Sequence, residues 1–422
     1  MLKLIKMTCE NTLQFAQQMD AQDPLRSFQN RFHFPKHHNK RVIYFCGNSL
    51  GLQPKNTEGV IKAELDYWRK NGVEGWFAGE KPWLSIHNDM SELAAPIVGA
   101  KPEEVVVMNT LTVNLHLLMV SFYRPTAKRF KIVMEAGAFP SDQYAVESQV
   151  RFHGFDPKEA IIEVNPRGGE DCLRIEDILQ VIDNQGDTLA LVLFGGINYY
   201  TGQFYDLAKI TEGGHRVGAK VGFDLAHAVG NVPLRLHDWG VDFAVWCGYK
   251  YLNSGPGSVA GAFIHEKHFN DETMPRFAGW WGYNEAKRFK MESGFEPMYG
   301  AAGWQISTAQ VIPLAMHRAS LEIFKEAGGI DVLSKKTQKM TDFLAFVLGQ
   351  SSHNFKIITP SVSIERGSQL SILTDENGKK LFDFLASNGV ICDWREPNVI
   401  RLAPVPLYCS FEEVWRVGQL MK

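Results

Sequence analysis

Short apolar runs alternate with segments of helical periodicity through the middle of this chain. The runs are rich in β-branched and aromatic residues, and each is followed by a stretch whose apolar positions recur every three or four residues. This alternation predicts an α/β domain built on a mainly parallel sheet. The apolar runs are residues 105–108, 130–134, 189–194 and 219–223, and the helical patterns include residues 111–122, 141–150 and 207–213.

The pattern changes near residue 312. Helical patterns at residues 312–327, 331–348 and 380–387 are combined there with strand-like runs at residues 355–358, 370–373 and 398–402. A chain of 422 residues also exceeds what one hydrophobic core usually supports. We therefore predict a large α/β domain over residues 46–311 and a smaller α+β domain over residues 312–422. Residues 1–45 are expected to pack on the smaller domain, by analogy at the level of the fold.

Composition and charge serve only to disfavour certain classes of partner. Hydrophobic residues make up 45% and charged residues 22%, and the formal net charge is −3. Such a balance favours neither a nucleic-acid nor an anionic-membrane partner. The longest apolar stretch, residues 115–123, is too short to span a bilayer, and residues 1–20 lack the apolar core of a signal peptide. We predict a cytoplasmic protein with no nucleic-acid or membrane partner.

The sequence predicts no metal site. Its six cysteines have no CxxC pair and no zinc-like spacing, and none of its 13 histidines belongs to an HExxH motif. Scattered cysteines in a long chain without a secretion signal are typically reduced and structural.

Two residues that follow apolar runs carry the first candidate chemistry. Asp224 ends the run at residues 219–223, and Lys250 follows a run at residues 242–247. Ligands of parallel α/β sheets bind beyond the carboxyl ends of the strands, where both residues fall. Pyridoxal phosphate needs such a pair, because a lysine holds it as a Schiff base and an acid keeps its ring nitrogen protonated. Each residue alone is weak evidence, because most lysines are solvated and most aspartates at strand ends cap a helix or a turn.

Three turns offer candidates for the rest of this cofactor. Residues 108–114 supply a strand end, a hydroxyl-rich turn and a helix start, which suit a phosphate. Taken alone, this turn is better explained as a helix N-cap formed by Thr110 or Thr112. Phe139, at a strand-to-helix turn, offers a face on which a pyridine ring stacks, and a core position is its alternative. Tyr249 is placed to bond the phosphate, or else is a sheet-edge tyrosine.

Arg401 stands in an apolar stretch, residues 399–404, and is the arginine that solvation explains least. A guanidinium binds a carboxylate through parallel hydrogen bonds. Arg401 is therefore a candidate for the α-carboxylate of a substrate, with a buried structural ion pair as the alternative.

Six segments, in order over nearly the whole chain, resemble the kynureninase family. They are residues 44–51, 111–116, 139–142, 222–230, 249–253 and 400–404. The resemblance implies a fold-type-I enzyme that uses pyridoxal phosphate to hydrolyse the Cβ–Cγ bond of L-kynurenine, giving anthranilate and L-alanine. It implies 3-hydroxykynurenine as a secondary substrate and a place in tryptophan catabolism and NAD biosynthesis.

The resemblance also implies roles for individual residues. Lys250 would carry the cofactor and move protons at the substrate Cα, Asp224 would pair with the ring nitrogen, and Tyr249 would shuttle a proton near the ketone. The implied cofactor-binding residues are Leu111, Thr112, Phe139, Pro140, Ser141, Asp142, Asp224, His227, Tyr249, Lys250, Trp280 and Thr308. The implied substrate-binding residues are Ser49, Trp76, Thr308 and Arg401. Trp280 matches a tryptophan that reaches the cofactor across a dimer interface, so a homodimer with a shared active site is implied.

Three positions depart from animal members of the family. Gly195 stands where those members commonly carry a serine, so one side-chain contact to the cofactor is absent or replaced. Trp76 and Thr308 stand where animal enzymes that prefer 3-hydroxykynurenine tend to carry His and Asn. Leaving a ring hydroxyl unpaired in a buried pocket costs roughly 1–3 kcal/mol. We therefore predict a preference for L-kynurenine.

Other functions on the same fold predict different chemistry. A cysteine desulfurase needs an exposed, reactive thiolate, whereas Cys247 lies in an apolar run. A small-molecule aminotransferase would release no anthranilate. A non-catalytic binding protein would have no use for the Lys250 and Asp224 pair.

Overall fold

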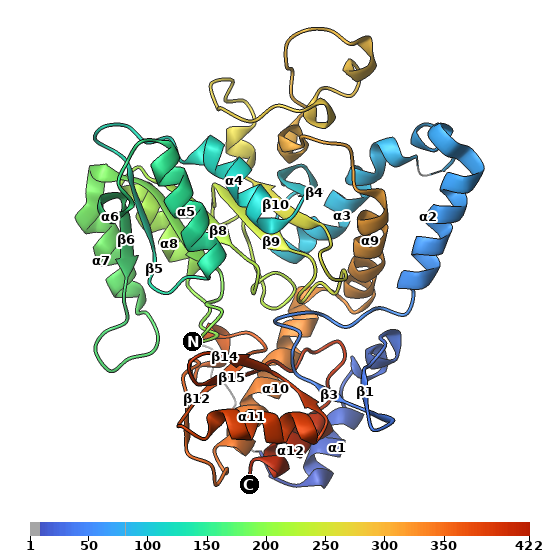
Figure 1. Ribbon diagram of the computed structural model, residues 1–422, viewed down its shortest axis with the longest axis vertical. Coiled ribbons are helices and arrows are strands. Elements are labelled where there is room, and N and C mark those ends of the chain that lie inside the picture. Colours follow the sequence, from blue (N-terminus) through green and yellow to red (C-terminus); the bar gives the residue numbers. More distant parts are fainter. Residues whose placement is uncertain (1–8, 81) are drawn as a thin grey trace.

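The computed structural model describes residues 9–80 and 82–422, and a seven-stranded sheet forms its centre (Figure 1). The strand order is β4-β10-β9-β8-β7-β5-β6. Neighbours from β9 to β6 pair in parallel, and β10 runs against both of its neighbours. The predicted, mainly parallel α/β sheet is therefore confirmed. The strands are β4 (Val105–Met108), β5 (Lys131–Glu135), β6 (Ile161–Val164), β7 (Leu189–Gly195), β8 (Lys220–Asp224), β9 (Phe243–Cys247) and β10 (Ala260–Ile264).

Both faces of this sheet are buried. Alternate residues of a strand point to opposite sides, so a single strand contributes side chains to the cores on both faces. In β4, Val105 and Val107 join one hydrophobic core, whereas Val106 and Met108 join a second. Helices α4 and α5 cover the second core, and α3, α7 and α8 pack on the first. Apolar packing on both sides therefore holds the strand ends in place. The helices are α3 (Ile86–Val98), α4 (Leu111–Phe122), α5 (Pro140–Phe152), α7 (Ile175–Gln185) and α8 (Leu207–Arg216).

A smaller antiparallel sheet lies below the first in Figure 1. Its order is β11-β12-β15-β14, and its two inner strands are the most buried. Helices α10 and α12 pack against each other beside it. The combination is the α+β arrangement that the sequence predicts for this part of the chain. The elements are α10 (Ile330–Leu348), β11 (Phe355–Ile357), β12 (Leu370–Thr374), α11 (Gly378–Ser387), β14 (Asp393–Arg395), β15 (Val399–Leu402) and α12 (Phe411–Leu420).

The first helix of the chain packs on the last. Helix α1 (Leu13–Ala21) lies against α12. The carboxylate of Asp20 accepts hydrogen bonds from the backbone N–H groups of Phe411, at 2.8 Å, and Glu412, at 3.0 Å. A carboxylate stabilises this position because the first N–H groups of a helix have no partner within the helix. The expected packing of residues 1–8 lies outside the described residues.

Two further contacts involve elements outside the two main sheets. Helix α9 (Val311–Glu326) packs against α2 (Thr57–Asn71) and α3, beside the larger sheet. Strand β3 (Ile43–Tyr44) pairs in parallel with β13 (Val390–Ile391). The division of the chain at residues 45 and 311 stays a prediction. The remaining short elements are β1 (Lys36–His37), β2 (Lys40–Arg41) and α6 (Pro157–Ala160).

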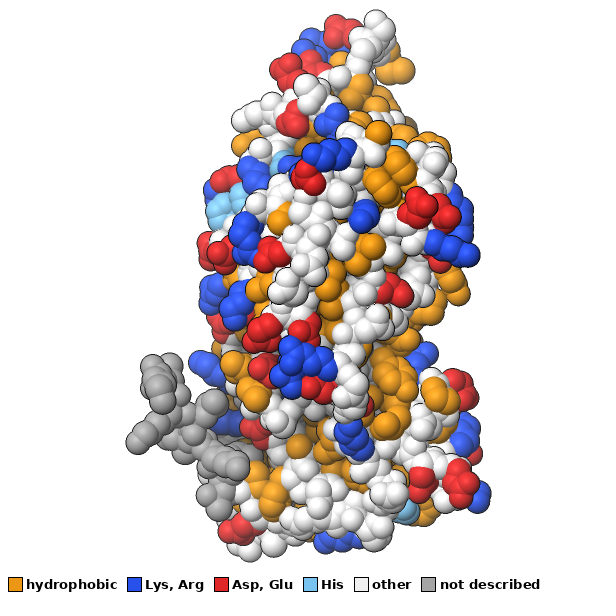
Figure 2. Space-filling view, turned by 90° about the vertical axis from the view of Figure 1, so that its left-hand side faces the viewer, with side chains coloured by type: hydrophobic (Ala, Val, Ile, Leu, Met, Phe, Trp, Pro, Cys, Tyr) orange, Lys and Arg blue, Asp and Glu red, His pale blue; other side chains and the backbone are white. Residues whose placement is uncertain are grey.

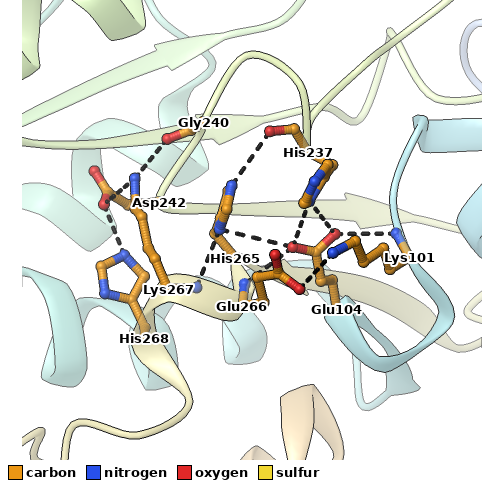
Figure 3. Close-up of polar contacts among 9 residues, drawn as sticks. All are labelled: Lys101, Glu104, His237, Gly240, Asp242, His265, Glu266, Lys267 and His268. Carbon is orange, nitrogen blue, oxygen red and sulfur yellow. Dashed lines mark hydrogen bonds and ion pairs between the residues drawn. The ribbon is translucent and has the colours of Figure 1, made fainter.

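A buried carboxylate ties together the amino-terminal ends of the strands that lead to Asp224 and Lys250. Asp242, just before β9, accepts hydrogen bonds from the Val221 N–H at 2.8 Å, from Nε2 of His215 at 2.8 Å and from Nε2 of His268 at 2.7 Å. Figure 3 shows the His268 contact together with the Lys267 ammonium group, 3.0 Å from Asp242. These donors outweigh the burial that would raise the pKa of Asp242 and hold it well below its ordinary value.

In the described ranges, none of the helices combines the length and the apolar character needed to cross a membrane.

Candidate active site

A pocket opens at the carboxyl edge of the seven-stranded sheet, where the ends of β5, β7 and β8 meet the first turns of α4 and α5. It lies where the strand pattern predicted it. The predicted residues in its lining are Leu111, Thr112, Phe139, Ser141, Asp142, Asp224, His227, Tyr249 and Lys250. Glu135, Gly195, Ile197, Tyr199 and Ala226 line it as well. Pro140 begins α5 between two of the lining residues.

Asp224 and Lys250 meet in this pocket because their strands are neighbours. Strands β8 and β9 pair in parallel, with Asp224 opposite Val245. The chain leaves β9 at Cys247 and turns, which brings Lys250 to the same edge of the sheet. Nζ of Lys250 lies 5.8 Å from the centre of the Phe139 ring. The two groups that the cofactor needs, a lysine and an acid, thus share one pocket.

Two helix starts converge at one end of the pocket. The Thr112 hydroxyl in the first turn of α4 lies 2.9 Å from the Ser141 hydroxyl in the first turn of α5. Asn109, just before α4, has a φ of +50°, and its side-chain amide donates to Oδ1 of Asn114 at 3.0 Å. This left-handed conformation, which Asn tolerates better than most residues, turns the chain sharply from β4 into the helix. Hydroxyl groups and N–H groups at paired helix starts suit a phosphate.

Phe139 and His227 offer two ring surfaces. Phe139 is 42% exposed and meets Tyr199 edge to face, with ring centres 5.2 Å apart. Because the ring lies beside Lys250 in the pocket, it offers a face on which a ligand ring can stack. Burial lowers the pKa of His227 well below its ordinary value, and the nearby Lys250 adds to this effect. His227 is therefore neutral, and its Nδ1 has no hydrogen-bond partner in the ranges described.

Three acids line the pocket. Burial raises the pKa of Asp142 well above its ordinary range, and the Asp224 carboxylate raises it further. Burial also raises the pKa of Asp224, but the Ala226 N–H at 2.7 Å and the charge of Lys250 oppose that rise. Asp142 therefore holds a proton more firmly, and Asp224 is the better partner for a cation. Burial raises the pKa of Glu135 to about 7. Sequence reasoning missed Glu135, although it ends its apolar run as Asp224 does.

Tyr249 joins the pocket to the N-terminal segment. Its carbonyl accepts the Gly51 N–H at 2.9 Å, which draws residues 46–51 toward the site. Burial raises the pKa of the Tyr249 hydroxyl above its ordinary value. The hydroxyl therefore keeps its proton at neutral pH and is available as a hydrogen-bond donor.

Arg401 reaches the pocket wall from the smaller sheet. Nη1 of Arg401 donates to the carbonyl of Tyr199 at 2.7 Å. Nη2 lies 2.6 Å from Oδ2 of Asp393 and 3.3 Å from the Ser49 hydroxyl. The Ser49 hydroxyl also donates to Asp393. Ser49 and Arg401, two of the four residues predicted to bind substrate, are therefore adjacent, and Arg401 holds a buried ion pair as well. Asp393 was not found from the sequence, because no local pattern marks it.

Three predicted residues lie away from this pocket in the single chain. Trp76, at the end of a 3-10 helix, meets Trp281 edge to face at 5.4 Å. Trp280 is 46% exposed and lines a separate hollow, and its indole N–H donates to the carbonyl of Arg288 at 3.1 Å. Thr308 is exposed just before α9. Trp280 and Thr308 are exposed and Trp76 is half-buried, and none of the three lines the pocket around Lys250.

Glu104, His237 and His265 form the single group in the described ranges whose three potential metal-ligand atoms lie within 4.8 Å of one another. In Figure 3 these atoms already engage other groups. The Glu104 carboxylate lies 2.9 Å from Nδ1 of His237 and accepts the backbone N–H groups of Lys101 and Glu266. Nδ1 of His265 accepts the Lys267 N–H at 3.1 Å. The group therefore links three segments of the chain, around Glu104, His237 and His265, through hydrogen bonds.

Solved structures share this fold. A cysteine desulfurase from Thermococcus onnurineus has a TM-score of 0.74 and 17% identity, over 90% of this chain and 94% of that one. A complex of a cystine C–S lyase with its product cysteine persulfide has a TM-score of 0.75 and 18% identity, over 90% and 97%. Likeness at this identity shows the fold alone, which is fold type I. The lysine, the acids, the paired helix starts and the uncovered ring fit pyridoxal phosphate, so fold and pocket together define a pyridoxal-phosphate enzyme.

Closer relatives narrow the class. Residues 333–421 match the model of the kynureninase C-terminal domain. A kynureninase from Flavobacterium psychrophilum is 56% identical and one from Flavobacterium johnsoniae 57%, each over 99% of both chains. A kynureninase from Nematostella vectensis is 48% identical over 96% of this chain and 92% of that one. The chain belongs to the kynureninase family, and it is an enzyme that uses pyridoxal phosphate to hydrolyse a carbon–carbon bond.

Proposed function

We propose that this enzyme hydrolyses the Cβ–Cγ bond of L-kynurenine and releases anthranilate and L-alanine, with 3-hydroxykynurenine as a secondary substrate. The reaction would serve tryptophan catabolism and NAD biosynthesis. The observation that carries the proposal is the meeting of Asp224 and Lys250 beside an uncovered Phe139 ring in a chain of this family.

The pocket supports a role for each residue around the cofactor. We propose that the first turns of α4 and α5, with Leu111, Thr112 and Ser141, hold the phosphate, aided by the Tyr249 hydroxyl. Phe139 and the neutral His227 would lie on the faces of the ring, and Asp224 would pair with its nitrogen. Pyridoxal phosphate, when bound at Lys250, supplies an electron sink for negative charge at the substrate Cα.

The chain's own groups would then move the protons. The Lys250 amine, once displaced by the amino group of the substrate, is the base that removes the Cα proton. The Tyr249 hydroxyl, which keeps its proton at neutral pH, would leave the phosphate and donate its single proton toward the ketone oxygen while water adds to the ketone carbon. Asp224 keeps the ring nitrogen protonated throughout, because a carboxylate stabilises a neighbouring positive charge.

Arg401 and Ser49 would bind the α-carboxylate of the substrate. Their adjacency supports this role, since a guanidinium and a hydroxyl both donate to a carboxylate. The incoming carboxylate must share Arg401 with Asp393 or replace it.

We further propose a homodimer in which a second copy supplies Trp76, Trp280 and Thr308 to the pocket. Support comes from the placement of these residues outside the pocket of their own chain and from the 46% exposure of Trp280. Mixed dimers test this, because one chain with Lys250→Ala and one with Trp280→Ala would rebuild one intact site. Activity that recovers on mixing supports a shared site, and two inactive variants that stay inactive together contradict it.

We propose the cytoplasm as the place of action and a small molecule, with no nucleic acid, as the partner. All six cysteines are unpaired, as is usual in reducing compartments. On the face shown in Figure 2, acidic and basic side chains are interspersed, whereas a nucleic-acid surface gathers basic ones.

The direct test gives the purified, cofactor-loaded enzyme L-kynurenine and, separately, 3-hydroxykynurenine, while anthranilate fluorescence and alanine are both followed. Equal amounts of the two products, formed faster from L-kynurenine, are expected. Alanine without anthranilate, or cleavage of neither substrate, would contradict the proposal. A desulfurase is disfavoured because burial raises the pKa of the Cys247 thiol and keeps it unreactive.

A further inference from the structure

Glu135 is a buried acid of the pocket, and none of the proposed roles involves it. It ends β5, is 4% exposed, and lines the pocket with Asp142 and Asp224. Burying a carboxylate without a paired cation is unfavourable. Buried acids of this kind are found most often at functional sites. Its position relative to Asp224 shows what it does.

Gly195 links the two acid-bearing strand ends. Strand β7 lies between β5 and β8, and Gly195 at its end stands opposite Asp224. From the other side, both carboxyl oxygens of Glu135 lie within hydrogen-bond distance of the Gly195 N–H, at 3.0 and 3.1 Å. The carboxyl group of Glu135 is therefore held at the same edge of the sheet as that of Asp224.

The room for this carboxyl group exists because residue 195 has no side chain. A Cβ at Gly195 would lie 2.8 Å from Oε1 of Glu135, which is closer than carbon and oxygen normally approach. Gly195 and Glu135 are thus a matched pair. The space that a Cβ at residue 195 would enter is thus taken by a carboxyl oxygen from the neighbouring strand.

We propose that Glu135 is a positioning residue for the cofactor, and that through Gly195 and the two aspartates it sets the negative charge facing the ring nitrogen and the Lys250 amine. The inference rests on the proposed function in one respect, which is that Lys250 attaches the cofactor and Asp224 faces its ring nitrogen. It does not depend on which substrate is cleaved.

The groups around Glu135 leave its charge adjustable. Asp224 from β8, Asp142 from α5 and the buried Tyr205 hydroxyl all face it, and the Lys250 cation lies beside the two aspartates. The fifth group, His227, is neutral. Burial raises the pKa of Glu135 to about 7, so its charge changes near neutral pH; burial and the Asp224 carboxylate raise the pKa of Asp142 as well. Negative charge here favours protonated forms of the cofactor's nitrogen atoms.

Glu135→Gln is the sharpest test, because glutamine keeps an acceptor for the Gly195 N–H and cannot ionise. The absorbance of the lysine-bound cofactor is titrated with pH in wild type, in Glu135→Gln and in the control Glu163→Gln, whose residue is exposed on the adjacent strand β6. We expect the titration midpoint of Glu135→Gln to move down by about half a pH unit or more, since lost negative charge favours the deprotonated form. The control should titrate as wild type does.

Steady-state kinetics add a second readout. We expect kcat of Glu135→Gln to fall about tenfold while KM stays within about twofold, because the change alters the cofactor's charge rather than substrate contacts. A midpoint and a kcat that both equal those of wild type would overturn the proposal. If wild type cleaves no L-kynurenine, the proposed function fails, and the spectral titration still decides the role of Glu135.

A measurement on the cofactor-free protein needs no activity. Burial favours protonated Glu135, whereas the unfolded chain ionises it near pH 4.3. Wild type should therefore lose stability relative to Glu135→Gln as pH rises from about 4 to about 7, the pKa in the folded protein, and the difference should level off above that. A stability difference that stays constant over this range would argue against an adjustable charge. Should Glu135→Gln not fold, Gly195→Ala crowds the carboxyl group away from its N–H donor and is expected to lower the spectral midpoint, and an unchanged midpoint there would overturn the proposal.

Discussion

Asp393 and Arg401 stand directly opposite each other on the neighbouring strands β14 and β15, and their charged groups meet at 2.6 Å in a buried ion pair. Arg401 is 1% exposed and extends past this partner to the Tyr199 carbonyl on the pocket wall. The ion pair keeps the guanidinium charged and oriented before substrate arrives. The proposed site for the substrate α-carboxylate is therefore already organised by the carboxylate of Asp393.

Arg401→Lys should raise KM for L-kynurenine by about tenfold or more and leave kcat less affected, because an ammonium group cannot form the two parallel hydrogen bonds of a guanidinium. Arg395→Lys is the matched control, since Arg395 pairs with the same aspartate but is more exposed. Steady-state kinetics on both variants provide the comparison. Equal KM values in the two would remove Arg401 from the substrate site.

Asp224→Asn should keep the cofactor bound at Lys250 and slow removal of the Cα proton about a hundredfold or more, because a neutral amide no longer holds the ring nitrogen protonated. The absorbance of the lysine-bound cofactor reports retention. Exchange of the substrate Cα hydrogen in heavy water, followed by NMR, reports the proton step. Exchange at the wild-type rate would refute the pairing of Asp224 with the ring.

Combining Trp76→His with Thr308→Asn should shift the ratio of kcat/KM for 3-hydroxykynurenine to kcat/KM for L-kynurenine about tenfold toward the hydroxylated substrate. The reason is that a hydrogen bond to the ring hydroxyl contributes roughly 1–3 kcal/mol. Trp68→His changes an exposed tryptophan in the same part of the chain and should leave the ratio alone. Both substrates are compared at one pH. A ratio unmoved by the double change would place these residues outside the ring-hydroxyl contact.

Asp242→Asn should lower the free energy of unfolding by about 3–5 kcal/mol at neutral pH, because it leaves His215, His268 and Lys267 without their shared carboxylate. The pKa of Asp242 is depressed in the folded protein, so its stabilisation is complete above about pH 4 and declines as pH falls below that value. The difference between variant and wild type should therefore narrow at low pH.

Chemical denaturation of Asp242→Asn at pH 7 and near pH 3 makes this comparison. Asp238→Asn, an exposed aspartate in the same loop, is the control and should cost little at either pH. A loss of the same size at both pH values would show that the carboxylate's charge is not what matters.

Local pattern was a good guide to the elements of the larger sheet. The predicted runs at residues 105–108 and 189–194 are strands β4 and β7, and Asp224 closes β8 as the run before it implied. These strands are legible because each is buried on both faces and so remains apolar throughout. Strand β6 and helix α7 went unpredicted, since β6 lies at the sheet edge with partly exposed residues and lacks a continuous apolar run.

Part of the candidate site could be predicted. Residues beside the ends of elements were predicted, whereas residues that depend on partners distant in the sequence were not. Lys250, Asp224, Phe139 and Thr112 were predicted because each lies within three residues of the end or start of an element, and the ends of parallel strands share an edge. Glu135 satisfied the same rule and was overlooked. Asp393 obeyed no local rule, because its importance comes from Arg401 across a strand pair and from Ser49, which lies 352 residues from Arg401 in the sequence.

The sequence by itself determined which segments become strands and helices, because hydrophobic period and turn chemistry act over a few residues. It also carried the family resemblance, from which the reactive residues are predicted. Only the tertiary structure decided that Gly195 stands between Glu135 and Asp224, that β10 enters between β4 and β9, and that Arg401 meets Ser49. Those contacts depend on strand order and register, which are set by packing between distant segments and leave no trace in any local pattern.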